Sequence, residues 1–419
     1  MRSKQVKQIL KITMDDDPDR PHSDESIENS LKDFDVKMLD WRKVDLCPEL
    51  IQRACKNVMS AHLRWSGNNI ALRAWSEPQG LPKLETPQRW RRSNLQSHRW
   101  LKAMNSFAEL IHGMEDIDTN ESHLKDPITV AVIDDGVNNC HPALRGKIHS
   151  EFSFHQRENM PIPYYVTSTG HGTVMATMIC RVCPKAKLQI FKLDTYTSND
   201  GTTQITAESA ALAVEAAVAR KVHIISMSWT IQETEDNKSG TRRLDAALRK
   251  AHDSNIIMLC SASDRGAHPD NNYPARFKVK QIFRIGAATA DGRVWGMAGD
   301  LANMDFILPG HNVFDAVGSY NGLLENFKPR TGSSVATALA AGQAALIMHC
   351  VRLAAIHSTK NVRTNFLSPR KHEAMKAALK RIGTSDEGQH KFIEVWNRFD
   401  SATENLRGAS MNEMLNYLA

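Results

Sequence analysis

The middle of the chain alternates short apolar runs with helix-forming segments, and few folds accommodate such a pattern. The apolar runs cover residues 128–133, 188–193, 222–227, 256–260 and 282–287. Continuous apolar runs are typical of strands that are buried on both faces of a sheet. Helical spacing is found between them, in segments 173–183, 206–220 and 242–254. The pattern predicts an α/β fold with three layers, in which helices cover both faces of a doubly wound, mostly parallel sheet.

Three polar motifs lie where strands of this sheet would end or helices would begin. Asp134 ends the run Val130-Ala-Val-Ile-Asp134, His171 lies in Gly170-His171-Gly172-Thr173, and Ser334 lies in Gly332-Ser-Ser334-Val-Ala-Thr337. Open α/β sheets place their chemistry at the carboxyl ends of strands. A carboxylate, an imidazole and a hydroxyl are the components of a serine nucleophile system. We therefore predict that Asp134 orients His171 and that His171 takes the proton of Ser334.

Two of these residues have a neighbour of the same type, which offers an alternative assignment. The position of Asp134 in the run Val-Ala-Val-Ile-Asp-x-Gly assigns the catalytic carboxylate to this residue. Asp135 is then expected to be a solvent-facing turn residue. The motif register assigns the nucleophile to Ser334 and leaves Ser333 just before it. Because a helix would begin at this point, its dipole and free N–H groups favour developing negative charge. The Ser334 N–H is therefore a predicted oxyanion donor.

These motifs resemble those of the subtilase family, whose nucleophile motif usually reads Gly-Thr-Ser-x-Ala-x-Pro. The order Asp, His, Ser along the chain is also that of subtilisin. The resemblance covers roughly residues 127–350 and looks closest to the fungal intracellular branch, whose leaders carry a segment similar to Ser66-Gly-Asn-Asn69. It implies a three-layer α/β sandwich and endopeptidase cleavage of proteins, without a cofactor.

The chain departs from the family pattern at three positions. Ser333 replaces the usual Thr and Ala338 the usual Pro, and both changes are mild. The serious departure is Asp264, which stands where the family has the Asn that donates to the oxyanion. An ionised carboxylate cannot donate, and loss of such a donor typically lowers the rate on the order of 10²–10³-fold. A carboxyl in a dry cleft can instead stay protonated, so we also consider Asp264 as a neutral donor.

The resemblance also marks two segments as the substrate cleft. The segment 226–230 resembles the strand to which family substrates add as an extra strand. The predicted substrate-binding residues are Ser228, Trp229, Thr230, Ser261, Ala262 and Ser263. Thr230 and Ser263 replace residues that are usually Gly, which implies a narrowed pocket. The alternative for Trp229 is that its side chain is simply packed in the core, and the sequence leaves both interpretations open.

We expect four regions along the chain. Residues 1–85 would form a small α+β leader module, 86–126 a basic helical connector, 127–352 the catalytic domain and 353–419 a helical C-terminal region. In the leader, we expect strands at 6–14 and 36–41, helices at 27–34 and 48–59, and a pair of strands at 62–65 and 70–75, with no evident internal repeat. The leader would serve as a recognition module, or as a folding aid or inhibitor through an intramolecular contact with the enzyme.

The remaining sequence features concern the binding partners of the protein and its cellular compartment. The connector mixes Trp with Arg, which can bind nucleic acid or a membrane surface, but we favour a solvated helix with packed Trp side chains. The net charge of +6 is too small to argue for nucleic acid. Seven scattered Cys and the lack of a signal peptide or membrane span indicate a cytoplasmic protein. The single Cys180-x-x-Cys183 indicates buried thiols, and we expect no metal and no cofactor.

Two functions of different classes fit these observations. The first is a serine endopeptidase that acts on a protein or peptide substrate, with Asp134, His171 and Ser334 as its triad. The alternative is a catalytically weak subtilase-fold module that acts as an intracellular sensor or protein-interaction domain. Asp264 favours the alternative, whereas the complete triad favours the enzyme.

Overall fold

The chain consists of two compact units, Met1–Gln96 and Ser97–Ala419. Each is described separately. The computed structural model describes residues 6–17, 21–41, 43–58, 60–61, 63, 66, 69–77, 80, 98–113, 126–157, 160–197, 203–266, 272–277, 281–313, 330–357, 368–385 and 389–406. Much of the predicted basic connector, including Arg89 to Arg92, and residues Gly67 and Asn68 of the leader motif lie outside these ranges.

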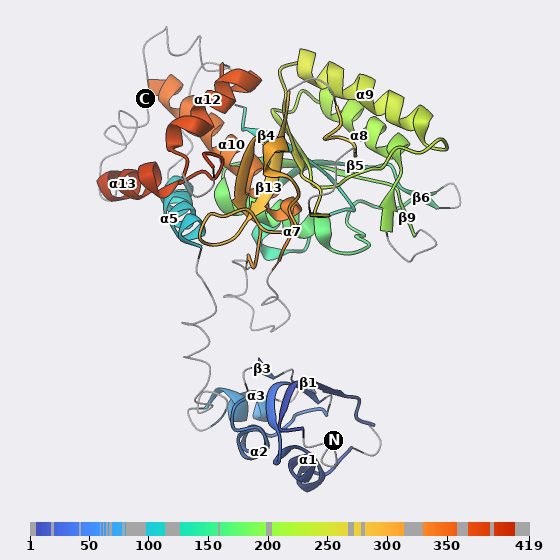
Figure 1. The fold of residues 1–419 in the computed structure, drawn as a ribbon, viewed down its shortest axis with the longest axis vertical. Helices are drawn as coiled ribbons and strands as arrows, with labels where there is room; N and C mark the ends of the chain where they lie inside the picture. The colour runs from blue at the N-terminus through green and yellow to red at the C-terminus, as the bar shows by residue number, and fades with distance from the viewer. Residues whose placement is uncertain are drawn as a thin grey trace. The chain divides into compact units, whose positions relative to one another are not determined.

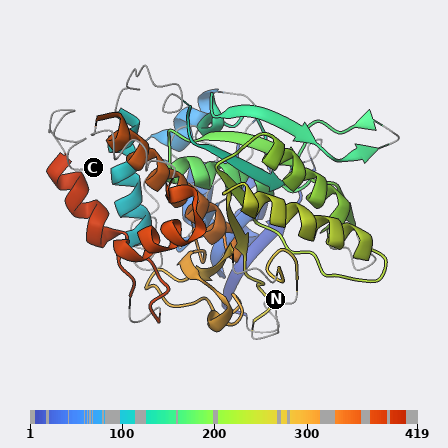
Figure 2. The same ribbon diagram turned by 90° about the horizontal axis from the view of Figure 1, so that it is seen from above.

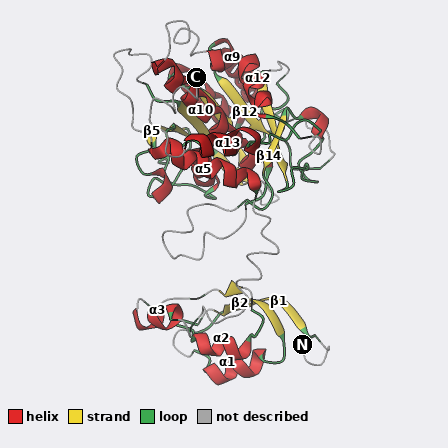
Figure 3. Cartoon of the chain, turned by 90° about the vertical axis from the view of Figure 1, so that its left-hand side faces the viewer, coloured by secondary structure: helices red, strands yellow, loops and turns green. Residues whose placement is uncertain are grey.

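The first unit contains a three-stranded parallel sheet, with one helix after each strand (Figure 3). Its elements are β1 (Gln8–Met14), α1 (Asp24–Leu31), β2 (Asp35–Trp41), α2 (Pro48–Ala54), β3 (Ser60–Ala61) and α3 (Asn69–Ser76). Ser23 begins α1 as expected, because its side chain accepts a hydrogen bond from the Ser26 N–H. The strand expected at 70–75 is wrong, since this segment is helix α3. Its Ala-Leu-Arg-Ala stretch has strong helix propensity, but Trp75 near its end had suggested a strand.

The segments around the three strands of this unit share an apolar pattern. It reads Ile9-x-x-Ile12-x-Met14, Val36-x-x-Leu39-x-Trp41 and Val58-x-x-Ala61-x-Leu63. The strand register aligns Ile12 with Leu39, and Leu39 with Ala61. The pattern recurs about every 22–27 residues, within the range of repeats that consist of one strand and one helix. The unit thus repeats a strand followed by a helix three times.

The second unit contains the predicted parallel sheet. Its strands are β4 (Thr129–Asp134), β5 (Ile148–Ser153), β8 (Lys187–Lys192), β11 (Ile224–Met227), β12 (Ile257–Ser261), β13 (Ile282–Ala288) and β14 (Phe306–Pro309). They lie in the order β14-β13-β12-β11-β4-β8-β5, and all neighbours are parallel. The five strands expected from apolar runs are confirmed. The two edge strands were missed, β5 because it alternates in burial and β14 because its apolar run ends in Pro309, and proline argues against a strand.

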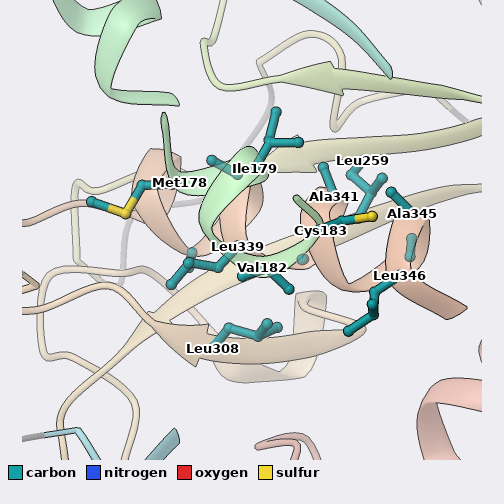
Figure 4. Packing of buried hydrophobic residues seen from close by; sticks show 14 of the residues in the cluster. Met178, Ile179, Val182, Cys183, Leu259, Leu308, Leu339, Ala341, Ala345 and Leu346 are labelled. Atoms are coloured by element: carbon teal, nitrogen blue, oxygen red, sulfur yellow. The ribbon is translucent and has the colours of Figure 1, made fainter. Parts of the chain in front are cut away.

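Helices cover both faces of this sheet (Figures 1 and 2). Helices α8 (Ala207–Ala219) and α9 (Lys238–Asp253) pack together on one face. Helices α7 (His171–Val182) and α10 (Ser333–His357) pack together on the other, where Ile179, Val182, Leu339 and Leu346 belong to one buried cluster (Figure 4). Part of α10 is long and apolar enough to span a membrane, but 78% of that stretch is buried, so α10 is a core helix. The three-layer α/β fold is confirmed.

Three further helices complete the core of the second unit. They are α5 (Arg99–Gly113), α12 (His372–Ile382) and α13 (Trp396–Leu406). Phe107 of α5 lies edge-on to Phe399 of α13, with ring centroids 4.8 Å apart, and Trp100 is buried. The part of the connector that the structure describes therefore packs into the second unit, with its Trp in the core. The same unit also holds the hairpin strands β6 (Gln156–Arg157), β7 (Met160–Pro161), β9 (Thr195–Thr197) and β10 (Thr203–Ile205).

Candidate active site

The first two predicted catalytic residues are placed by the ends of two elements. Asp134 is the last residue of β4, which lies between β8 and β11, and His171 is the first residue of α7. The start of α7 lies directly against the end of β4, which requires glycine at position 172. A Cβ atom there would lie 2.3 Å from the carbonyl oxygen of Gly136 and 3.0 Å from Cβ of Asp134. The motif Gly170-His171-Gly172 therefore allows the close approach that brings the imidazole to the carboxylate.

Asp134 and His171 are in direct contact. The Nδ1 atom of His171 lies 2.9 Å from Oδ1 and 3.0 Å from Oδ2 of Asp134. Asp134 is 5% exposed, and its Oδ1 also accepts a hydrogen bond from the Asp135 N–H at 2.8 Å. With Nδ1 held by the carboxylate, Nε2 is the ring nitrogen that can exchange a proton with a substrate or a nucleophile.

The electrostatic environment makes His171 strongly basic. The negative charge of Asp134 raises the pKa of His171 to about 9, against the effect of burial, and the charge of Asp135 adds to the increase. Arg330 acts in the opposite direction and lowers this pKa. Arg330 lies four residues before Ser334 in the chain.

Ser333 and Ser334 occupy the first turn of α10 in different environments. Ser333 is fully buried, and its Oγ accepts a hydrogen bond from the Ala287 N–H at 3.1 Å while donating to Asp264 at 2.6 Å. Ser334 is half-buried, and its carbonyl oxygen accepts a hydrogen bond from Ser228 at 3.2 Å. The hydroxyl of Ser333 is thus engaged in the core, which leaves Ser334 as the better candidate for a nucleophile.

Asp264 lies at the start of α10 and acts as a hydrogen-bond acceptor. Its Oδ2 accepts from the Ser333 N–H at 2.9 Å, and its Oδ1 accepts from the Ser333 hydroxyl. A point at the ideal Cβ position of Gly332 would lie 3.2 Å from both Asp264 Oδ2 and Ser334 Oγ, so the two groups flank this glycine. Two donors at a helix N-terminus favour the ionised carboxylate. The arrangement gives no support to the neutral acid that we considered.

The residues predicted to bind substrate lie at or just after the ends of β11 and β12. Ser228, Trp229, Ser261, Ala262 and Ser263 are buried, and Thr230 is half-buried. The indole Nε1 of Trp229 donates to the carbonyl oxygen of Ile133 at 2.9 Å, directly before Asp134. Trp229 is therefore packed against β4, which favours the structural interpretation of its side chain. Ala262 continues β12 along β13 through a hydrogen bond to the Ile285 carbonyl.

The expectation that Asp135 is a solvent-facing turn residue is wrong. Asp135 is 7% exposed and accepts five side-chain hydrogen bonds. The donors are the N–H groups of Thr169 and Gly172 and the hydroxyls of Thr167, Ser168 and Thr169. Burial raises the pKa of Asp135, but these hydrogen bonds outweigh it and hold the pKa below the ordinary value. The only sequence signal was the hydroxyl run Thr167-Ser-Thr169 just before His171.

The thiols and carboxylates show no arrangement for a metal in the described part of the chain. None of its His, Cys, Asp and Glu side chains form a group of three or more that could hold an ion. Cys180 and Cys183 are buried in the core of the second unit, and burial raises the pKa of each thiol to about 12. Thiols that stay protonated in this way are poor metal ligands and poor nucleophiles.

Comparison with known proteins identifies related sequences. The model of the subtilase family matches residues 125–383. An intracellular serine protease of Paenibacillus polymyxa is 28% identical over 233 residues, which cover 52% of this chain and 66% of the relative. The subtilisin-like protease het-Q2 of Podospora anserina is 30% identical over 190 residues, which cover 44% of this chain and 50% of the relative. The matches thus span between half and two thirds of these relatives.

A solved structure supports the fold. The crystal structure of a lanthipeptide protease superposes with a TM-score of 0.51 and 16% sequence identity, over 74% of this chain and 97% of the other. At this identity the likeness concerns the fold alone. It includes more of the chain than the sequence matches do, because three-dimensional structure diverges more slowly than sequence.

Proposed function

The chain belongs to the subtilase family, and on this basis we propose that it is a serine endopeptidase that hydrolyses peptide bonds through Asp134, His171 and Ser334. The observation that carries the proposal is the contact of His171 Nδ1 with both carboxylate oxygens of Asp134. This contact fixes the tautomer in which Nε2 is free to act as a base. The names of the relatives, which are serine proteases, agree with this activity.

In the proposed reaction, the Ser334 hydroxyl attacks the carbonyl carbon of the scissile peptide bond, and His171 Nε2 takes its proton. The imidazolium, stabilised by Asp134, then gives this proton to the leaving amine as the C–N bond breaks. Water attacks the resulting ester by the same route, returning the proton to Ser334 and releasing the carboxyl product. The first turn of α10 supports this role, because its N–H groups and dipole favour the negative charge of the tetrahedral intermediate.

Asp264 makes the proposed enzyme a slow one. Its carboxylate accepts from Ser333 and lies beside Ser334, so it repels the growing oxyanion where the family pattern has a donor. The Ser334 N–H remains as a donor. Loss of one donor lowers kcat on the order of 10²–10³-fold, which leaves measurable activity.

The proposed substrate is an extended segment of a protein that pairs with the backbone after β11, at Ser228–Thr230. Because Trp229 is packed, this pairing would rely on backbone groups more than on the indole. The relatives include two proteases described as intracellular, and we propose that this chain acts in the cytoplasm.

Labelling with a fluorophosphonate probe tests the proposed function. The probe forms a bond to an activated serine oxygen, so we expect labelling of the full chain and of the Ser333→Ala variant. The Ser334→Ala variant should not be labelled. Equal labelling of Ser334→Ala, or no labelling of a folded wild-type protein, would refute the proposal, and the latter result would favour the interaction module.

A further inference from the structure

We propose that Asp135 is a positioning residue that holds both Asp134 and His171 in place, an inference that rests on the proposed function. Asp135 follows Asp134 directly, and its side chain reaches the turn that precedes α7. It therefore contacts the backbone on both sides of His171 as well as the carboxylate that orients the imidazole.

The side chain of Asp135 holds the backbone N–H groups around His171, either by direct hydrogen bonds or through a hydroxyl group. Its carboxylate accepts directly from the N–H groups of Thr169 and Gly172, at 2.7 and 2.8 Å. The N–H groups of the two residues between them donate to hydroxyls that in turn donate to Asp135. Gly170 donates to Thr167 Oγ1 at 2.8 Å, and His171 donates to Thr169 Oγ1 at 3.2 Å. All four N–H groups from Thr169 to Gly172 thus lead to one carboxylate.

The backbone of Asp135 is equally well anchored. Its N–H donates to Asp134 Oδ1 at 2.8 Å, which fixes the orientation of that carboxylate. Its carbonyl oxygen accepts from the Nζ atom of Lys192 at 2.6 Å, and Lys192 is 2% exposed. A buried lysine without a charged or polar partner would be strongly unfavourable, so this contact holds Asp135 firmly at the end of β4. Movement of Asp135 would displace both Asp134 and His171.

The charge of Asp135 has a second effect, which a neutral hydrogen-bonding residue could not have. The charged groups that act on His171 are Asp134 and Asp135, which favour the imidazolium, and Arg330, which opposes it. Lys192 offsets part of the charge of both carboxylates from the next strand, where burial lowers its own pKa. Removing the charge of Asp135 should therefore lower the pKa of His171 as well as loosen the turn.

Kinetics of matched variants of the full chain test this inference. For Asp135→Asn we expect kcat roughly 10- to 100-fold lower, from the loss of charged hydrogen bonds, with KM changed little. In this variant, the acidic limb of the pH profile of kcat/KM should move to lower pH. Thr167→Val removes one hydroxyl but keeps the carboxylate, so kcat should fall up to about tenfold without movement of the limb. The control Asp245→Asn, on α9, removes a carboxylate that pairs with Arg249 and should change neither quantity.

A measurement without substrate separates this inference from the proposed function. In the Ser334→Ala background, the titration of the His171 ring by NMR reports its pKa, with the resonance assigned through His171→Gln. We expect a lower pKa in Asp135→Asn than in the unsubstituted background. An unchanged pKa together with a wild-type kcat would overturn the inference, whereas absence of all hydrolysis would count against the proposed function only. Should Asp135→Asn fail to fold, a wild-type kcat in Thr167→Val would overturn it.

Discussion

Asp264 accepts two hydrogen bonds from Ser333, one from the backbone N–H and one from the hydroxyl. Both residues depart from the subtilase pattern, so the two departures are in direct contact at the start of α10. The carboxylate and the hydroxyl satisfy each other there, and the hydroxyl also accepts from the Ala287 N–H. Changes at either position should therefore be interpreted together.

Replacing the carboxylate by an amide should activate the enzyme. In Asp264→Asn, the carbonyl oxygen can keep a hydrogen bond from Ser333 while the NH₂ group donates to the oxyanion. We expect kcat to rise by about 10²–10³-fold with little change in KM, measured with a peptide substrate. Asp264→Ala, which removes the charge without adding a donor, should gain less. A lower kcat in Asp264→Asn than in the wild type would contradict this role.

The activity should have an alkaline pH profile. Below its raised pKa of about 9, His171 is an imidazolium and cannot accept the proton of Ser334. We expect kcat/KM to increase with pH and to level off above about pH 9. Stability should change in the opposite sense, because the folded chain binds this proton more tightly than the unfolded chain. The stabilisation is complete below pH 6.5 and is lost as the pH rises through about 9. An acidic limb near pH 6.5 would contradict the prediction.

A methyl group at position 172 should damage the site. The Cβ atom in Gly172→Ala would overlap the carbonyl oxygen of Gly136, so the start of α7 must move away from β4. We expect stability to fall by about 1–3 kcal/mol in thermal or urea unfolding. A displacement of His171 by about 1 Å would lower kcat on the order of 10²-fold. Gly296→Ala is the control, because nothing lies within 4 Å of its Cβ position. Equal effects of the two variants would refute the steric argument.

The indole of Trp229 should matter for stability and not for substrate preference. Trp229→Phe keeps a buried ring but removes the indole hydrogen bond to the Ile133 carbonyl oxygen. We expect a loss of about 1–3 kcal/mol in unfolding free energy and an unchanged ranking of peptide substrates. Trp295→Phe, at a half-buried ring stacked on His311, should lower the unfolding free energy less. A changed side-chain preference in Trp229→Phe would show that the ring reaches the substrate.

The sequence predicted those parts of the site that depend on local pattern. Asp134 follows a continuous apolar run and His171 lies between two glycines. Both patterns can be recognised in the sequence without knowledge of the fold. Asp135 was misjudged because its partners, Thr167 to Thr169, come from a distant loop without periodicity. The role of Ser333 was equally hidden, since only the folded structure shows that its hydroxyl links Ala287 to Asp264.

In the fold, too, the elements with a clear local pattern were predicted and the others were missed. Five strands buried on both faces were found from their apolar runs, whereas β5 alternates in burial and was missed. The basic residues around α5 concealed the apolar stripe of Trp100 and Phe107, which joins this helix to the second unit. The repeat of the first unit was overlooked because its members share only the type of residue, and because β3 is two residues long.

The packing of α7 against α10 gives remote positions influence over the chemistry. His171 begins one of these helices and Ser334 lies in the first turn of the other. Gly342, about two turns along α10, lets them approach closely, since a Cβ atom there would lie 2.8 Å from the Ile179 carbonyl oxygen. A side chain at position 342 would force the two helices apart, and we expect their first residues to shift with them. Variation at such inward-facing glycines could therefore change turnover without touching a single group that meets the substrate.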